Sequence, residues 1–460
     1  MTNFNNFVFV FTICFVLNVL NVFADSLSLS QLSVSAESTN PTVSAVSLSD
    51  SGIYLTKSEF DEFLRDYRLS HSLSSGVSGS SIFRSRKIKI TPYGYINLSA
   101  SYETQRTVTG DYAVYANSPD IENDSGYNVD PKSTRLGLKL EGVGISGWKG
   151  SKSEGAVEFD FQGAYQSRNR GGLLLRKAYF SVSDGKTKIL AGQDWEIISP
   201  LYPKTLNYTA GACVGNVGYR RAMLRVDRQF DLCNSADNFL LQFGITDNVF
   251  RDDNAVSPAA SSYPIIQGRL AYSIARGRNH GSNKPIILGV SSHFGEQRFT
   301  FGGIKKSLPT WSFNVDFDLP LTKCLWFQME YFIGENLATI EGGILQGVDI
   351  ARQETIRSQG GWMALTYQAT KKTQMNFCYM VDDPFNKDVI SGNSNSNRAR
   401  NYSHCLFINL LYNWSDSLMT GFEIDFWRTH WQQYDPVTKK INSLSPGKPI
   451  RYDFTIRYTF

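Results

Sequence analysis

The sequence of 460 residues contains no long hydrophobic run after its first 24 residues. A helix that crosses a bilayer needs about 20 consecutive apolar residues, and residues 25–460 contain no segment of that kind. In lipid, only helices and closed barrels satisfy their backbone polar groups. If the protein is integral to a membrane, it is therefore a β-barrel.

The sequence also has few features of nucleic-acid-binding, metal-binding or disulfide-linked proteins. The net charge is only +4 and no basic run carries interleaved aromatic residues, so we expect no nucleic-acid partner. No CxxC or HxxxH spacing occurs, so we expect no metal site and no cofactor. Six cysteines, of which Cys14 lies in the first 24 residues, leave a scattered odd set that is no disulfide framework. A bridge between Cys378 and Cys405 stays open, because both are expected to face inward on one hairpin.

The amino-terminal region is predicted to have three parts. Residues 1–24 carry no charged side chain, and their apolar stretch is too short for a spanning helix, which predicts a signal peptide, with a membrane anchor as the alternative. Residues 25–88 are a Ser-rich periplasmic linker. Within it, residues 55–69 are predicted to be a short amphipathic helix, because Phe60, Phe63, Leu64 and Tyr67 follow its i, i+3, i+4, i+7 spacing.

The last ten residues alternate polar and apolar side chains without a break. Tyr452, Phe454, Ile456, Tyr458 and Phe460 fall on one face, and Arg451, Asp453, Thr455 and Arg457 fall on the other. A strand that is apolar on one face, polar on the other and ends the chain on an aromatic residue is typical of a transmembrane barrel with a wet interior. Aromatic residues make up 13% of the sequence, which fits barrels that expose only alternate residues to lipid.

About sixteen segments with this period follow one another between Thr91 and Phe460, and the connections between them alternate in length. Seven are short, and eight long ones begin at Glu103, Ala164, Asp194, Asp247, His293, Gly334, Asp382 and Thr429. This parity is typical of an up-and-down barrel whose two ends lie on one side of the membrane. We therefore predict an all-β fold, a 16-stranded antiparallel transmembrane β-barrel over residues 89–460. A period-two pattern misses or adds a hairpin easily, so 14 and 18 strands stay open.

The predicted inward faces are ionic. Glu158 and Asp160 share one face of their segment, and Arg135 and Lys139 share a face of the segment before it. A barrel of this size with a charged, wet interior is wide enough for a channel. The alternative is a structural barrel that is plugged by its own loops.

The third long connection, 194–219, is rich in proline, glycine and aromatic residues, as expected for a loop that packs inside a lumen. Here the sequence resembles general bacterial porins, and more closely DcaP-like porins, in Tyr93–Ile96, Ser133–Leu138, Leu175–Tyr179 and Ala191–Trp195. The resemblance implies a homotrimer in the outer membrane, with the third loop narrowing each pore for small hydrophilic solutes. It also implies that the barrel-assembly machinery reads Phe460 and that residues 55–69 belong to an amino-terminal helical extension.

The resemblance also suggests residues that line the constriction. It places Arg135 and Arg176 on the wall opposite the third loop, and strand alternation adds Lys139, Arg221 and Arg225. The loop itself contributes Asp194, Glu196 and Lys204. A basic cluster between low-dielectric walls raises the local anion concentration, so the hypothesis is a weak preference for anions such as dicarboxylates. Neutralisation of these arginines by nearby acids is the open alternative.

Two other classes of function stay open. An outer-membrane enzyme needs a Ser or Asp paired with a His at one rim, and a plugged barrel that acts in structure or adhesion needs only its outer loops. No nucleophile motif accompanies any histidine, so no catalytic residue is predicted. The histidines are expected in linkers, in a turn or at loop margins; they are His71, His280, His293, His404 and His430.

Overall fold

A computed structural model of the protein describes residues 83–84, 88–163, 171–232, 236–248, 263–275, 284–393 and 396–460. All of them belong to one compact unit, Gly52–Phe460. The predicted signal peptide (1–24), the predicted helix (55–69), Cys233, His71 and His280 lie outside the described residues. No described helix is long and apolar enough to cross a membrane.

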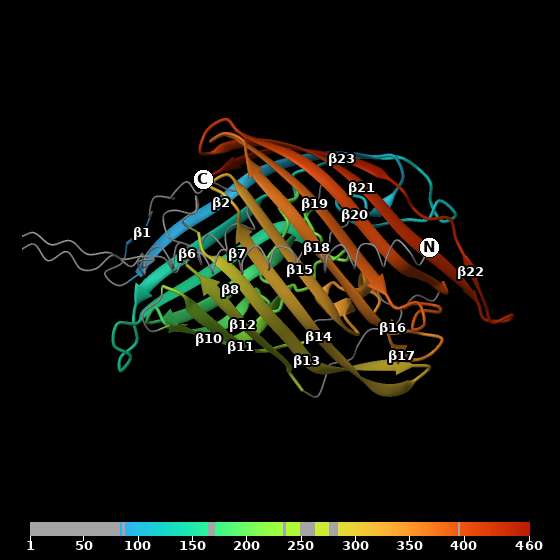
Figure 1. Ribbon diagram of the computed structural model, residues 1–460, viewed down its shortest axis with the longest axis horizontal. Helices are drawn as coiled ribbons and strands as arrows, with labels where there is room; N and C mark the ends of the chain where they lie inside the picture. Colours follow the sequence, from blue (N-terminus) through green and yellow to red (C-terminus); the bar gives the residue numbers. More distant parts are fainter. Residues whose placement is uncertain are drawn as a thin grey trace, which may run out of the picture. The chain divides into compact units, whose positions relative to one another are not determined.

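Sixteen antiparallel strands form one closed barrel (Figure 1), as predicted. Each strand pairs with its neighbours in sequence, and the last pairs with the first. The barrel strands are β2 (Ile88–Glu103), β6 (Arg135–Val143), β7 (Lys152–Gly163), β8 (Gly172–Ser183), β9 (Thr187–Trp195), β10 (Arg220–Asp231), β11 (Asn238–Thr246), β12 (Ile265–Ile274), β13 (Ile286–Phe301), β14 (Ile304–Pro320), β15 (Leu325–Glu335), β18 (Arg357–Gln368), β19 (Thr373–Pro384), β20 (Arg398–Asn413), β21 (Leu418–Asp435) and β23 (Ile450–Thr459).

The barrel closes where the two ends of the sheet meet. β2 and β23 pair antiparallel from Tyr95 opposite Thr459 to Glu103 opposite Arg451. Two backbone hydrogen bonds between Gly94 and Phe460, at 3.2 and 3.0 Å, complete the seam. Because closure leaves no strand edge unpaired, every backbone group along the seam is satisfied within the sheet.

The predicted alternation of faces in the final strand is confirmed. Arg451 is 1% exposed, whereas its outward neighbours on β23, Phe454 and Tyr458, are 43% and 51% exposed. Large apolar side chains are exposed on the same outward face of most other strands, among them Leu98, Val157, Phe243, Phe377 and Phe422. Polar side chains that face inward are buried because the lumen is filled by loops rather than open across its full width.

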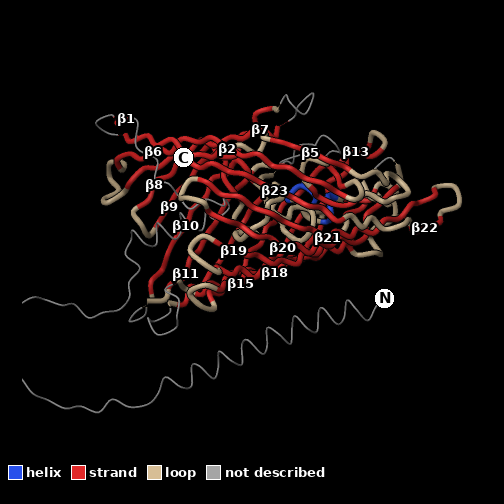
Figure 2. Tube along the Cα trace, turned by 90° about the horizontal axis from the view of Figure 1, so that it is seen from above, coloured by secondary structure: helices blue, strands red, loops and turns tan. Residues whose placement is uncertain are grey.

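The smaller elements lie in the long connections at one rim. Loop 1 (residues 104–134) contains β3 (Thr107–Thr109), β4 (Ala113–Ala116) and β5 (Gly126–Asp130), and β5 adds to the outer half of β2. Loop 6 (residues 336–356) contains two 3₁₀ turns, η2 (Ala338–Ile340) and η3 (Gly343–Leu345), seen in blue in Figure 2, with β16 (Val348–Asp349) and β17 (Glu354–Thr355). In loop 8 (residues 436–449), β22 (Lys440–Ser443) pairs antiparallel with the end of β21. At the opposite rim, β1 (Phe83–Arg84) pairs with the start of β2.

Several strands run further than the sequence pattern indicated. The fifth long connection was expected to begin at His293, but β13 continues to Phe301 and turns through Gly302 and Gly303 into β14. Likewise β21 continues to Asp435, past the expected start of a long connection at Thr429, and β20 begins at Arg398. The expectation that the described histidines lie at loop margins is therefore wrong: His293, His404 and His430 all lie within strands.

The open question of a bridge between Cys378 and Cys405 has a clear answer, because both are free, buried thiols. They lie on neighbouring strands and face inward, but Cys378 is opposite Phe407 and Cys405 is opposite Met380. They are therefore diagonal neighbours, about 7–8 Å apart, which exceeds the usual Cα separation across a disulfide.

Candidate functional site

The third long connection folds into the lumen, where one acidic side chain at its own base and two of the barrel wall hold it. Loop 3 (residues 196–219) connects β9 and β10. At its base the Glu196 carboxylate accepts the backbone N–H of Tyr219 at 2.7 Å and lies 2.6 Å from the Arg221 guanidinium, which is fully buried. Arg221 also donates to the Thr339 carbonyl of loop 6 at 2.6 Å. This pair therefore joins the two ends of loop 3 to loop 6.

The middle of loop 3 is held by acids from two distant strands. Glu330 of β15 accepts the backbone N–H of Leu201 at 2.7 Å and the hydroxyl of Ser199 at 2.5 Å. Glu423 of β21 accepts the backbone N–H of Leu206 at 2.9 Å and the hydroxyl of Thr205 at 2.5 Å. A loop that leaves the sheet has unsatisfied backbone groups, and the oxygens of these side chains supply acceptors for them.

Glycine allows loop 3 to approach the wall closely. Gly215 has φ +115°, and a Cβ there would lie 2.4 Å from the carbonyl oxygen of Gly361 on β18. Both the left-handed backbone and the lack of space require glycine. The opposing wall position is itself a glycine, so the two backbones meet without side chains between them.

Loops 1 and 6 pack on loop 3. The Asn207 side chain exchanges two hydrogen bonds with the backbone of Ala113 in β4, at 3.1 and 2.8 Å. On the other side, the Gly218 N–H donates to the Ile340 carbonyl at 2.7 Å. The three loops therefore form one interlocked body inside the barrel.

One side of the lumen is apolar, which the prediction of an ionic interior did not include. Leu201 and Val214 of loop 3 lie in a buried cluster with inward side chains of four neighbouring strands. The wall members of this cluster are Trp362, Ala364, Cys378, Met380, Cys405, Phe407 and Trp427. Burial of this apolar surface fixes loop 3 against β18–β21, and the polar opening is left on the opposite side.

That opening is a cavity of about 80 Å³ between loop 3 and the strands at the closing seam. Loop 3 contributes residues 202–208 and 210, and the wall contributes residues of β2, β6, β7 and β23. Its cationic lining consists of Arg135, Arg451, Arg457 and Lys204, and its acidic lining consists of Asp111, Asp130 and Asp453.

Two of these guanidinium groups share one aromatic ring. The guanidinium carbon of Arg457 lies 4.2 Å from the ring centre of Tyr95, and that of Arg135 lies 5.3 Å from it. Arg457 donates to the Asn97 side chain at 3.0 Å, and Arg135 lies 3.7 Å from Glu158. The Tyr95 ring stabilises both cations while their charges stay directed at the cavity.

A second layer lies behind the cavity. Arg176 donates to Glu158 at 2.9 Å, to Asp160 at 2.7 Å and to the Tyr208 hydroxyl at 3.0 Å. Tyr208 in turn donates to Asp160 at 2.9 Å. Burial raises the pKa of the Tyr208 phenol to about 12, so it stays a neutral donor. The result is a hydrogen-bonded cluster that fixes the Tyr208 part of loop 3 to β7 and β8.

The loop side of the cavity carries Lys204, a cation that titrates near pH 8. Burial lowers the pKa of the Lys204 ammonium to about 8, and the charge of Lys284 acts in the same direction. Burial also raises the pKa of Tyr202 well above its ordinary value. Lys204 therefore carries most of its charge at pH 7 and loses it in mildly alkaline solution.

The structure separates the eight residues suggested from the sequence. Arg135 and Lys204 line the cavity. Arg176 lies behind Tyr208, and Glu196 and Arg221 form the pair at the base of loop 3. The other three pair elsewhere: Asp194 with Lys177 at 3.8 Å, Arg225 with Asp227 at 2.7 Å and Lys139 with Glu141 at 3.0 Å.

The alternation of the last strand predicts Arg457 in the charged wall, but it does not connect Arg457 with Arg135, and Tyr95 was not among the predicted lining residues. The position of Arg457 beside the first strand could have been predicted, since closure of a barrel makes the first and last strands neighbours. Applying closure to the alternation of Arg451–Phe460 brings Arg457 beside Asn97, which is the register observed.

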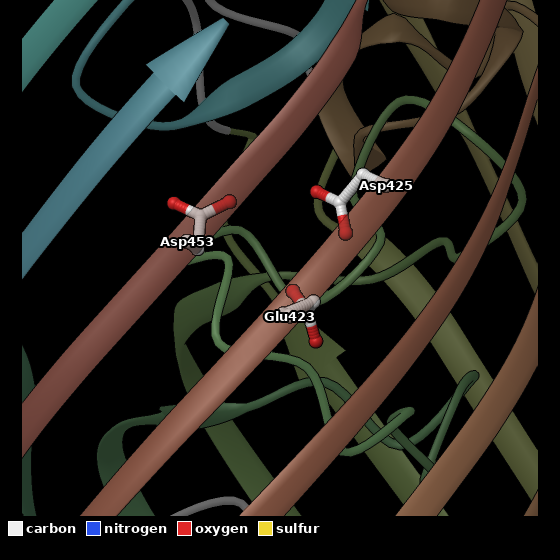
Figure 3. Close-up of side chains that lie close together, drawn as sticks. All are labelled: Glu423, Asp425 and Asp453. Atoms are coloured by element: carbon white, nitrogen blue, oxygen red, sulfur yellow. The ribbon is translucent and has the colours of Figure 1, made fainter.

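Three buried carboxylates, Glu423, Asp425 and Asp453, lie close together on β21 and β23, with their oxygens within 4.8 Å of one another (Figure 3). They are oxygen donors of the kind that Ca²⁺ accepts. Glu423 holds loop 3, and Asp453 accepts from Arg451 at 2.9 Å. In this arrangement the cluster serves the seating of loop 3 and the pairing of Arg451.

Comparison with known proteins rests on the fold. No protein-family model and no curated protein sequence matches this chain. The outer membrane channel DcaP of Acinetobacter baumannii superposes with a TM-score of 0.63 at 15% identity, over 84% of this chain and 100% of that chain. The anion-selective porin from Comamonas acidovorans (12% identity, 81% and 100% of the chains) and OmpF of Salmonella typhi in complex with daunomycin (12%, 83% and 100%) each give a TM-score of 0.49.

This chain therefore has the fold of bacterial outer-membrane channels. Within that class, the resemblance to DcaP-type barrels expected from the sequence is confirmed for the fold.

Proposed function

We propose that the protein is a porin, a passive diffusion channel for small hydrophilic solutes in the bacterial outer membrane. The barrel fold supports this, because its outward face is apolar and its lumen contains a cavity with charged walls. The similarity to the DcaP channel supports it further. Loop 3 then forms the constriction, and the solute passes between this loop and the seam strands β2, β6 and β23.

One observation supports a preference for anions: the acids that line the cavity have cationic partners, whereas some of its cations have no acidic partner within the residues that the structure describes. Asp453 is paired with Arg451 at 2.9 Å, and Asp111 and Asp130 share the single ammonium of Lys132. Arg457 and Lys204 form no ion pair among the described residues, and Arg135 has only the 3.7 Å contact with Glu158. Unpaired cations between low-dielectric walls concentrate anions, so small carboxylates are the proposed solutes.

The reversal potential across a planar bilayer under a KCl gradient tests this proposal. The expected sign is that of anion preference, and the double variant R135Q/R457Q is expected to shift it toward cations. R228Q is the matched control, because Arg228 is exposed on the outside of β10. Cation preference in the wild type contradicts the selectivity, and a barrel without conductance contradicts the channel itself.

Further parts of the proposal concern assembly. A homotrimer is expected to close its pores in three equal conductance steps. Removal of Phe460 is expected to lower the yield of inserted barrel, since this residue closes the seam with Gly94 and is the proposed contact of the assembly machinery. Sequencing the mature amino terminus tests removal of residues 1–24 and retention of the linker (25–88) before the barrel (89–460).

A further inference from the structure

A row of basic side chains crosses the outward face of the barrel near its long-loop rim. His404 of β20 lies directly opposite Arg428 of β21. The bridge between Thr429 and Gly447 continues this pairing into loop 8, which brings Lys448 opposite Arg428. The residues on either side of Arg428 are buried in the lumen, so the row faces away from the lumen.

Hydrogen-bonding groups flank this row. The Tyr379 hydroxyl lies 3.2 Å from Nδ1 of His404. Tyr402 is opposite His430 one step nearer the rim, and its ring centre lies 5.4 Å from that of His404 and 5.7 Å from that of His430. Two permanent cations, two imidazoles and two phenols therefore share one patch, which we call the outer basic row.

The two cations are not balanced by acids. Like charges directly opposite each other destabilise a sheet, yet neither Arg428 nor Lys448 forms an ion pair within the described residues. Nε of Arg428 is buried and has no hydrogen-bond acceptor in the described part of the chain. The outward carboxylate of Asp383 is on β19, and β20 separates β19 from Arg428 on β21. The row has the charge expected of a site for an anionic ligand.

The height of the row above the short-turn rim shows where the row lies relative to the apolar band of the barrel. At the short-turn end of β20 the Tyr412 and Trp414 rings lie 4.9 Å apart, as in an interfacial aromatic girdle. With about 3.4 Å per residue and a strand tilt of about 40°, His404 lies about 21 Å above Tyr412. The apolar band of such barrels is about 25 Å tall, so the row lies at the upper membrane interface.

We propose that the outer basic row binds the phosphorylated headgroup of a lipid in the outer leaflet. Phosphate accepts from Arg, Lys and phenolic donors together, and exposed apolar side chains continue below the row for the acyl chains, including Phe426 and Ile408, each 43% exposed. A free phosphate ion has no acyl chains that could pack on this apolar wall. The inference rests on the proposed place of the barrel in an outer membrane.

Binding of diphosphorylated lipid A to the full chain in detergent, followed by native mass spectrometry, tests the proposal. Lipid A is expected to bind, while its dephosphorylated form and inorganic phosphate are expected to bind far more weakly. R428Q/K448Q is expected to weaken lipid A binding about 30-fold, which corresponds to about 1 kcal/mol for each cation near a lipid surface. R428K/K448R, which keeps both charges, is expected to retain binding.

R228Q is the matched control, because Arg228 is also exposed on a strand's outward face but lies near the short-turn rim. Equal binding of the dephosphorylated lipid, unchanged binding by R428Q/K448Q, or occupation by inorganic phosphate alone each overturns the proposal. Conductance of R428Q/K448Q, measured in parallel, is expected to equal that of the wild type. A failed lipid test therefore leaves the channel proposal standing, and an absent conductance contradicts the channel without involving the row.

Discussion

The Glu423 carboxylate of β21 accepts the backbone N–H of Leu206 in loop 3 at 2.9 Å. A side chain of the wall thus replaces the backbone acceptor that Leu206 would have in a sheet. The same carboxylate accepts from Asn409 of β20 at 2.6 Å, so loop 3 and two strands depend on one group.

Replacing Glu423 with Ala is expected to release the middle of loop 3. Each buried donor left without an acceptor costs about 1–3 kcal/mol, and the loop contributes several donors at this point. Single-channel recordings are expected to show a larger and noisier conductance, and the melting temperature is expected to fall. E154Q, at another carboxylate of the wall, is the control; a wild-type conductance and melting temperature in E423A would contradict the role assigned to Glu423.

Gly215→Ala is expected to displace loop 3 from β18. The new Cβ would meet the Gly361 carbonyl at 2.4 Å, in addition to the cost of φ +115°. Gly303→Ala isolates the backbone cost, because Gly303 also has a positive φ of +88° but has open space around it. Thermal unfolding is expected to show that the free energy of unfolding falls by about 1–2 kcal/mol for G303A and falls clearly further for G215A. Equal losses would mean that close contact with Gly361 is unimportant.

Anion preference is expected to fall between pH 7 and pH 9. The pKa of Lys204 is lowered from 10.5 to about 8, so its charge disappears over this range while the arginines keep theirs. The reversal potential measured at both pH values reports the change, and K204M is expected to remove it. Because the unfolded chain binds more protons at Lys204 between pH 8 and 10, stability is expected to rise with pH in that window. A pH-independent reversal potential in the wild type would exclude Lys204 from the selectivity.

Cysteine labelling is expected to report the inward positions of two thiols. Cys324 is exposed in a short turn, whereas Cys378 and Cys405 are fully buried. Maleimide is expected to modify Cys324 in the folded protein and the other two only after unfolding, with mass spectrometry as the readout. The variant C324S, which lacks the exposed thiol, is the control for labelling at Cys324. A mass loss of two hydrogens at Cys378 and Cys405 without added oxidant would show a bridge and contradict their register.

Strand positions were predictable wherever one face meets lipid and the other meets polar groups. The period-two pattern of residues 238–246 and 265–274 predicts two strands with the bounds that β11 and β12 have. The prediction failed beyond His293 in β13, because outward residues such as Glu296 and Arg298 no longer need to be apolar there. Once the strand leaves the apolar band, period-two hydropathy disappears although the hydrogen-bonded ladder continues.

The candidate site was predictable only in part. Alternation shows that Glu330 and Glu423 face inward, but it does not show which inward acids meet a loop. That choice depends on the path of loop 3, which follows from close backbone approach at Gly215 and from apolar contacts of Leu201 and Val214 with the wall. These contacts join residues far apart in sequence, and no local pattern encodes them.

The anchoring of loop 3 also bears on the order of events in folding. Its acceptors come from Glu196, Glu330 and Glu423, and the last of these is 217 residues from its partner Leu206. Contacts of such long sequence separation form only after the intervening chain is ordered. Loop 3 is thus expected to be seated after most of the wall has assembled, so that a nascent barrel passes through a wider, leakier stage and narrows in its final step.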